Sequence, residues 1–293
     1  MKKLIDQNLI VRRMKPRLLK NSFYKYLFLS ATVFCLIVLA ILFGRILYQG
    51  LPHLDWQFLN SLPSRKPEEA GIYTALNGTI WLMGVVAPVT FIIGVAAAIY
   101  LEEYAKQNRF TRFIEINISN LAGVPSVVYG LLGLTLFVRS FAFGRSVLAA
   151  GLTLSLLVLP VIIVSAQEAI RAVPKELRDA SYAMGATKWT TIYRVVIPAA
   201  LPGILTGSIL ALSRAIGETA PLVVLGIPLF LAFLPNSVFD EFTALPMQIY
   251  NWTSRPQTEF HELAASGIIV LLALLVIMNS VAVLIRNKFS RRY

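Results

Sequence analysis

The sequence predicts an all-α polytopic membrane protein with six transmembrane helices. Apolar residues make up 57 % of its 293 residues and charged residues only 14 %, whereas soluble domains carry about 25 % charged residues. The mean hydropathy is +0.69, and uncharged runs near the ~20 residues that cross a bilayer recur along the chain. The net charge of +12 does not indicate nucleic-acid binding, because so few charges cannot cover a solvated surface.

The apolar runs place the spans in order along the chain. A basic tail is predicted over 1–25 and another over 287–293, and 49–71 is predicted as an extracytoplasmic loop before a core of five spans over 72–286. Glycine and prolines after residue 225 break the apolar stretch over 226–239, which predicts an outer hairpin or a partly re-entrant loop. The six spans are 26–48, 72–101, 116–138, 146–167, 201–225 and 263–285.

The distribution of lysine and arginine sets the orientation. With six spans, 20 of the 27 basic residues fall in segments on the side of the two termini, six fall on the opposite side, and Arg214 lies in the membrane. Loops on the cytoplasmic side carry the excess of Lys and Arg. Both termini are therefore predicted to be cytoplasmic.

Several kinds of enzyme site have no candidate residues. There is no GxxxxGK[ST] phosphate loop, and the only cysteine is Cys35. His53 and His261 lack metal-ligand spacing and are predicted to be ordinary loop residues, so no metal site is expected. No catalytic residue and no cofactor on this chain are predicted, and an intramembrane enzyme is the most distant alternative. The remaining interpretation is a membrane scaffold that transports or senses something.

The loop over 171–200 predicts a short exposed helix. Pro174 suits a first helical position, and Leu177, Ala180, Ser181 and Met184 then share one face. Gly185 is expected to end the helix. Such a helix either docks into a partner's groove or lies at the membrane interface.

Arg214 and Glu218 are the charged residues of the predicted fifth span. They are four residues apart, which places them on one helical face near the bilayer centre. Charge is costly there, so the pair either joins helices or lines a pathway. A guanidinium suits an oxyanion, and Glu218 can accept a hydrogen bond from a protonated one, such as hydrogen phosphate, but repels sulfate.

The loop also resembles the EAA loop of ABC importer permeases. Asp179-Ala180-Ser181, Gly185 four residues later, and Val195-x-Ile197-Pro198 match the spacing of the family pattern Glu-Ala-Ala, Gly and Ile-x-Leu-Pro. The resemblance implies that Asp179, Ala180, Ser181 and Gly185 belong to a coupling helix that contacts a cytoplasmic ATPase. Asp in place of Glu and Ser in place of Ala are mild departures.

A second resemblance is more specific. Arg-Ala-Ile-Gly-Glu-Thr-Ala-Pro at 214–221 is similar to the signature of phosphate ABC importer permeases, and Thr219-Ala-Pro resembles the A-type (PstA) branch. The segments 122–130, 171–174 and 245–250 also resemble this family. The likeness implies a type I importer (MetI-like) fold and inorganic phosphate as substrate, with Thr219 beside the pathway.

The resemblance also implies a location in a bacterial cytoplasmic (inner) membrane and partners that composition does not reveal. These are a second, C-type permease, a cytoplasmic ATPase dimer that binds ATP and Mg, and an extracytoplasmic phosphate-binding protein, all around membrane lipid. Glu168 and Arg171 are a possible second charged station, or an interface ion pair or part of the coupling contacts. Sulfate or molybdate as substrate, and a non-transporting sensor or scaffold, remain alternatives.

Overall fold

The computed structural model describes residues 7–106 and 108–289, which are almost entirely helical apart from loops and one isolated bridge between Ser146 and Glu241. The α-helices are α1 (Gln7–Gly50), α2 (Trp56–Asn60), α3 (Tyr73–Ile99), α4 (Arg109–Leu121), α5 (Ser126–Gly133), α6 (Val147–Arg171), α7 (Lys175–Ala183), α8 (Lys188–Thr191), α9 (Ile197–Gly217), α10 (Ala220–Leu225), α11 (Leu245–Thr253) and α12 (Thr258–Phe289). The 3₁₀ turns are η1 (Leu51–His53) and η2 (Pro67–Glu69), and the π-helical segments are η3 (Tyr100–Tyr104), η4 (Leu134–Ser140) and η5 (Ile192–Val196).

Within the described residues, five helical stretches are long and apolar enough to cross a membrane, and a bent pair supplies a sixth. The predicted count of six spans is confirmed when the bent pair counts as one. The single stretches are Arg17–His53, Tyr73–Tyr104, Val147–Arg171, Lys188–Gly217 and Thr258–Lys288, and the pair is Arg109–Leu121 with Ser126–Ser140.

The chain divides into two compact units, one ending at Gln49 and one beginning at Gly50. The first contains most of α1, an uninterrupted helix on which the ring of Tyr24 stacks on that of Phe28. The predicted boundary between tail and span at residue 25 falls inside this helix, so residues 7–25 are helical. Residues 1–6 and 290–293 of the predicted tails lie outside the described part.

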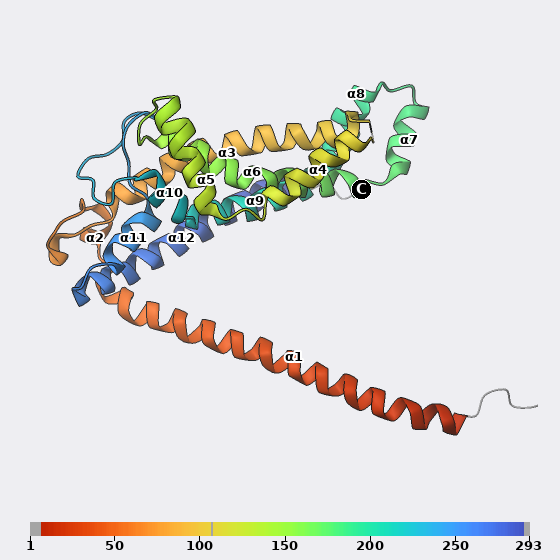
Figure 1. Cartoon of the computed structure of the whole chain (residues 1–293), viewed down its shortest axis with the longest axis horizontal. Helices are drawn as coiled ribbons and strands as arrows, with labels where there is room; N and C mark the ends of the chain where they lie inside the picture. The colour runs from red at the N-terminus through yellow and green to blue at the C-terminus, as the bar shows by residue number, and fades with distance from the viewer. Residues whose placement is uncertain (1–6, 107, 290–293) are drawn as a thin grey trace, which may run out of the picture. The chain divides into compact units, whose positions relative to one another are not determined.

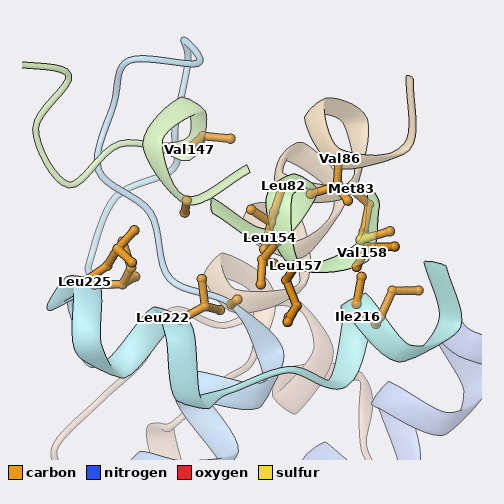
Figure 2. Packing of buried hydrophobic residues seen from close by; sticks show 14 of the residues in the cluster. Leu82, Met83, Val86, Val147, Leu154, Leu157, Val158, Ile216, Leu222 and Leu225 are labelled. Carbon is orange, nitrogen blue, oxygen red and sulfur yellow. The ribbon is translucent and has the colours of Figure 1, made fainter. Parts of the chain in front are cut away.

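In the second unit, α6 is the central helix. It packs against α3 on one side and α9 on another, and most of its residues are buried. Figure 2 shows Leu154 and Leu157 of α6 between Leu82 of α3 and Leu222 of α10. In Figure 1, α7 and α8 lie at one end of this unit, and α2 and α11 lie at the opposite end. The long axis of α6 therefore connects the loop that carries α7 to the opposite face.

Close helix approach at α6 depends on residues without a side chain. A Cβ on Gly207 of α9 would lie 2.4 Å from the Cβ of Ser165, and one on Gly133 of α5 would lie 2.0 Å from the Oγ1 of Thr153. Small residues allow helices in membranes to pack backbone to backbone. The interfaces of α6 with α9 and α5 are of this type.

Two predicted spans are not continuous helices. The third bends by 102° between α4 and α5. Pro125 stands at the bend with an extended ψ of 137°, because proline has no N–H for the helix and disfavours helical geometry in the residue before it.

The fifth predicted span, 201–225, breaks instead at Glu218, which has ψ 115°. Its helical stretch begins earlier, at Lys188, and ends at Gly217. Pro221 in the first turn of α10 lacks the N–H that a continuous helix would bond to Gly217. The residues that follow, 226–239, contain no helix and tie to α6, where Leu148 N–H donates to Val238 O at 2.8 Å.

Candidate functional site

The break between α9 and α10 holds the central charged pair. Arg214 lies in the last turn of α9, and Glu218 is the extended residue directly after that helix. The Nε of Arg214 donates to Oε1 of Glu218 at 3.0 Å. The expectation that both residues share the face of one continuous helix is corrected, because the carboxylate belongs to the break and folds back onto the arginine.

The two charges of this pair differ in their surroundings. The side chain of Arg214 is 56 % exposed in this chain, and that of Glu218 is 16 % exposed. The exposed Leu210 precedes Arg214 by one turn on the same face of α9. The guanidinium therefore projects from a surface that this chain leaves open, and only its Nε is used by Glu218.

The backbone on both sides of the break is held by the core. Ile216 and Leu222 are buried, and Figure 2 places them on the two helices that flank the break, both beside α6. Gly130 of α5 packs against α10 so closely that a Cβ there would lie 2.9 Å from Cα of Pro221. The apolar side of the break is fixed by packing while its charged side is open.

Thr219 is the third residue that sequence analysis assigned to this site. It is the N-terminal flanking residue of α10, and its hydroxyl lies 3.5 Å from Gly217 O. It is therefore next to Glu218 in the break and has a weakly engaged hydroxyl. The structure brings Arg214 and Glu218 into contact and places Thr219 next to Glu218 in the chain.

The predicted coupling loop forms the expected helix and turn. α7 follows Pro174, and Gly185 adopts φ +79°, a left-handed conformation that favours glycine. Asp179 and Ala180 are exposed, while the hydroxyl of Ser181 is 2.9 Å from that of Thr191. The short helix α8, which contains Trp189, begins the following helical stretch, Lys188–Gly217.

The face of α7 that was predicted from its periodicity borders a cavity. A hollow of about 410 Å³ lies between α7 and the start of the next span and is lined by Leu177, Ala180, Ser181, Met184, Ala186, Arg194, Val195 and Ala199. A second hollow of about 410 Å³ lies on the other side of Leu177 and is lined by Ala169, Ala172, Val173, Pro174, Leu177, Ala199, Ala200 and Gly203. Leu177, which lines both hollows, also packs against the buried cluster that includes Ala200 and Ile204 of α9.

Glu168 and Arg171 are part of a larger ion-pair cluster at the C-terminal end of α6. Arg171 Nη1 lies 3.3 Å from Glu168 Oε1, and Arg171 also pairs with Glu102 of η3. Gln167 donates to the same Glu102 carboxylate at 3.4 Å. With two carboxylates on its guanidinium, Arg171 fits an interface ion pair better than an open anion station.

Sequence reasoning missed the neighbouring pair of Arg178 and Glu103. Arg178 Nη2 lies 3.0 Å from Glu103 Oε1, and the two side chains are 19 % and 10 % exposed. The available signal was the Glu-Glu dipeptide at 102–103, which ends the uncharged run 70–101 and precedes a basic loop. That signal shows no partner, because the bonded residues are 75 positions apart.

The histidines lie on the other side of the second unit. His53 Nε2 lies 3.3 Å from Glu262 Oε2, and His261 Nε2 is 2.7 Å from Arg255 O. Both belong to helical turns, η1 and α12, rather than to loops as expected. Within residues 7–106 and 108–289 there is no group of three or more His, Cys, Asp or Glu residues that could hold a metal ion.

Comparison with known proteins gives a consistent picture. The family profile described as "Binding-protein-dependent transport system inner membrane component" matches residues 90–292. The chain is 35 % identical over 285 residues to "Phosphate transport system permease protein PstA 1" of Mycobacterium tuberculosis (strain CDC 1551 / Oshkosh), covering 94 % of this chain and 91 % of the relative. It is 36 % identical over 250 residues to the protein named PstA in Mycobacterium leprae (strain TN), covering 82 % and 80 %.

Solved structures share the fold at low sequence identity. A chain of the inward-facing MetNI methionine ABC transporter aligns with a TM-score of 0.60 at 16 % identity, over 75 % of this chain and 98 % of the other. A chain of a bacterial alginate ABC transporter aligns with a TM-score of 0.62 at 14 % identity, over 94 % and 96 %. Both support the MetI-like importer fold that the sequence resemblance implied.

Proposed function

The chain belongs to the PstA family of binding-protein-dependent transport system inner membrane components, and we propose that it forms half of the translocation pathway of an ATP-driven inorganic phosphate importer. The observation that carries the proposal is the half-exposed Arg214 guanidinium beside a largely buried carboxylate at a helix break. A charged group near the middle of a membrane protein is costly unless it faces protein or a wet pathway.

The chemistry of the break suits a protonated oxyanion. The guanidinium nitrogens of Arg214 that Glu218 does not engage can donate to the oxygens of phosphate in a planar fork. Glu218 can accept a hydrogen bond from a P–OH group, which sulfate lacks at neutral pH. The hydroxyl of Thr219 is a further donor within the same break. Together, Arg214, Glu218 and Thr219 form a transient station for hydrogen phosphate.

The open face around Arg214 needs a partner to enclose it. Exposed apolar side chains occur on α5 and on α9, where Leu210 lies one turn from Arg214, and the proposed partner would cover them; they are Val127, Val128, Leu131, Leu132 and Leu210. The C-type permease is the proposed second half, so that the two chains enclose the pathway as a heterodimer. Other exposed apolar residues on α12, such as Val276 and Leu284, suit contact with lipid.

The ATPase dimer is proposed to bind at α7. Asp179, Ala180, Ser181 and Gly185 lie on the short helix and turn beyond the end of α6, on a segment rich in basic residues that the charge distribution places in the cytoplasm. ATP and Mg bind to the partner ATPase, since this sequence has no phosphate-binding loop. Movement of α7 would open the pathway alternately to the binding protein outside and to the cytoplasm.

Transport by the reconstituted complex tests the proposal. The four components are placed in lipid vesicles with ATP inside, and uptake of labelled phosphate is measured with and without an excess of unlabelled phosphate, sulfate or molybdate. The expected result is ATP-dependent uptake that phosphate inhibits and the other anions do not. Equal inhibition by sulfate would replace phosphate with a broader oxyanion substrate, and no uptake of any anion would favour a sensor or scaffold.

A further inference from the structure

The coupling helix α7 is only partly embedded in the rest of the chain. None of residues 175–183, all of which the structure describes, is buried. Leu177 packs against the buried cluster that includes Ile170 and Ala200, and hollows of about 410 Å³ are lined by Leu177 and its neighbours. Because no residue of α7 is buried, polar contacts are needed alongside this packing to fix its position.

Arg178 supplies most of these polar contacts. Its Nη1 donates to Val173 O at 2.9 Å, and its Nη2 donates to Ile170 O at 2.9 Å and to Glu103 Oε1 at 3.0 Å. One side chain thus joins α7 to the last turn of α6, to the connection between the two helices, and to the end of the α3 stretch. The planar guanidinium makes these contacts together, which an ammonium group cannot do in the same geometry.

The carboxylate partner stands on a π-helical turn. In η3, Ala105 N–H donates to Tyr100 O at 2.8 Å, five residues back. This wider turn brings successive side chains closer in direction than an α-helix does. As a result, Glu102 reaches Arg171 of α6 while the adjacent Glu103 reaches Arg178 of α7.

We propose that the pair Glu103–Arg178 transmits movement of the coupling helix α7 to the transmembrane helices α3 and α6. This proposal rests on the proposed function. Arg178 is a positioning residue: it touches no substrate and acts by making α7, α6 and the end of α3 move together. When the ATPase displaces α7, an intact Glu103–Arg178 pair makes α3 and α6 move with it. Without the pair, α7 turns about its connection at 172–174 and the spans stay in place.

Glu103→Gln is the informative change. Glutamine is close in size and keeps an oxygen that accepts from Arg178, so the local fold is retained while the ionic attraction is lost. The matched control is Glu69→Gln. Glu69 also pairs at 3.0 Å, with Lys66, but that pair is exposed and distant in sequence from α7.

The measured quantity is the amount of phosphate taken up per ATP hydrolysed by the reconstituted complex. In Glu103→Gln this ratio is expected to fall at least about fivefold, because removing one partner of a mostly buried pair leaves the other charge uncompensated, while ATP hydrolysis stays within about twofold. Arg178→Lys is expected to lower the ratio similarly, since lysine cannot make the fork. Glu69→Gln is expected to leave it unchanged.

Three outcomes for Glu103→Gln would overturn the proposal. Uptake and hydrolysis both stay at the wild-type level, both fall in parallel so that the ratio is unchanged, or the variant complex no longer assembles. The last two would assign the pair to folding rather than to transmission. The wild-type arm tests the function separately. If the wild type carries another oxyanion, the substrate assignment fails and the role of the pair is tested with that anion, while wild-type vesicles that take up none overturn both proposals.

Discussion

Arg178 and Arg214 make the same contact in contrasting surroundings. Each donates to a glutamate at 3.0 Å, and in each pair the carboxylate is mostly buried. The guanidinium of Arg178 is also mostly buried and is bonded to two backbone carbonyls. That of Arg214 is more than half exposed, and Glu218 accepts only from its Nε, so its two terminal nitrogens are available to a ligand. The first arrangement suits a structural connection, and the second suits a ligand that comes and goes.

The largest expected effect comes from removing the exposed arginine. Arg214→Ala is predicted to lower phosphate uptake at least about tenfold, since each hydrogen bond to a charged group contributes about 1.5–3 kcal/mol and 1.4 kcal/mol is a factor of ten. The measurement is uptake by the reconstituted complex, with co-purification of the ATPase as the check on assembly. Normal uptake in an assembled complex would remove Arg214 from the pathway.

A change in the turn after α7 ranks next. Gly185→Asp is predicted to lower both uptake and the stimulation of ATP hydrolysis by the binding protein several-fold. A Cβ at Gly185 meets nothing within 4 Å, but φ is +79°, and a second acidic group would join Asp179 at the docking surface. Gly185→Asn has the same size and no charge, and Asn tolerates this φ, so it is the matched control. Equal loss in both variants would assign the defect to the backbone alone.

The carboxylate of Glu218 is expected to affect selectivity between anions more than the rate of phosphate uptake. Glu218→Gln removes the charge that repels a fully deprotonated anion and keeps an oxygen beside Arg214. Sulfate is therefore predicted to inhibit phosphate uptake about threefold more strongly in the variant than in the wild type. This factor lies within the ~0.2–1 kcal/mol typical of one partly exposed charge interaction. Unaltered competition would assign Glu218 to helix packing.

The smallest effect is predicted for the exposed pair of Lys66 and Glu69. Screening by water makes such pairs weak, so Lys66→Gln should change neither uptake nor the thermal midpoint. The hydrogen bond and charge of Glu69 raise the pKa of the Lys66 ammonium above 10.5. Any contribution of the pair is therefore present below pH 10.5 and is lost as the pH rises through the raised value. A lower midpoint for Lys66→Gln at neutral pH would show that the pair matters.

The transmembrane helices and the coupling helix were readable from local patterns. An uncharged run near ~20 residues identifies a span without knowledge of its neighbours, and Pro174 and Gly185 mark the two ends of α7 through their own backbone preferences. The spacing of Asp179 and Gly185 then carried the resemblance to the family.

The break after α9 and the contact between Glu103 and Arg178 could not be predicted in this way. Apolar character continues across Glu218, so hydropathy cannot show that the chain extends there, and only Pro221 hints at it. Glu102, which pairs with Arg171, stands 69 residues before it, and Glu103 stands 75 residues before Arg178. Periodicity describes one element at a time and contains no information on which distant carboxylate a guanidinium will meet.

The π-helical turn at the end of α3 gives these carboxylates an adjustable direction. Its bonding is offset by one residue from that of the α-helix before it. If residues 100–104 exchanged this bonding for the ordinary register, Glu102 and Glu103 would swing about the helix axis while Ala98, buried one turn earlier, stayed in place. A slip of a single hydrogen bond would therefore re-aim two acidic groups together, and the buried Leu101 of the same turn would move with them.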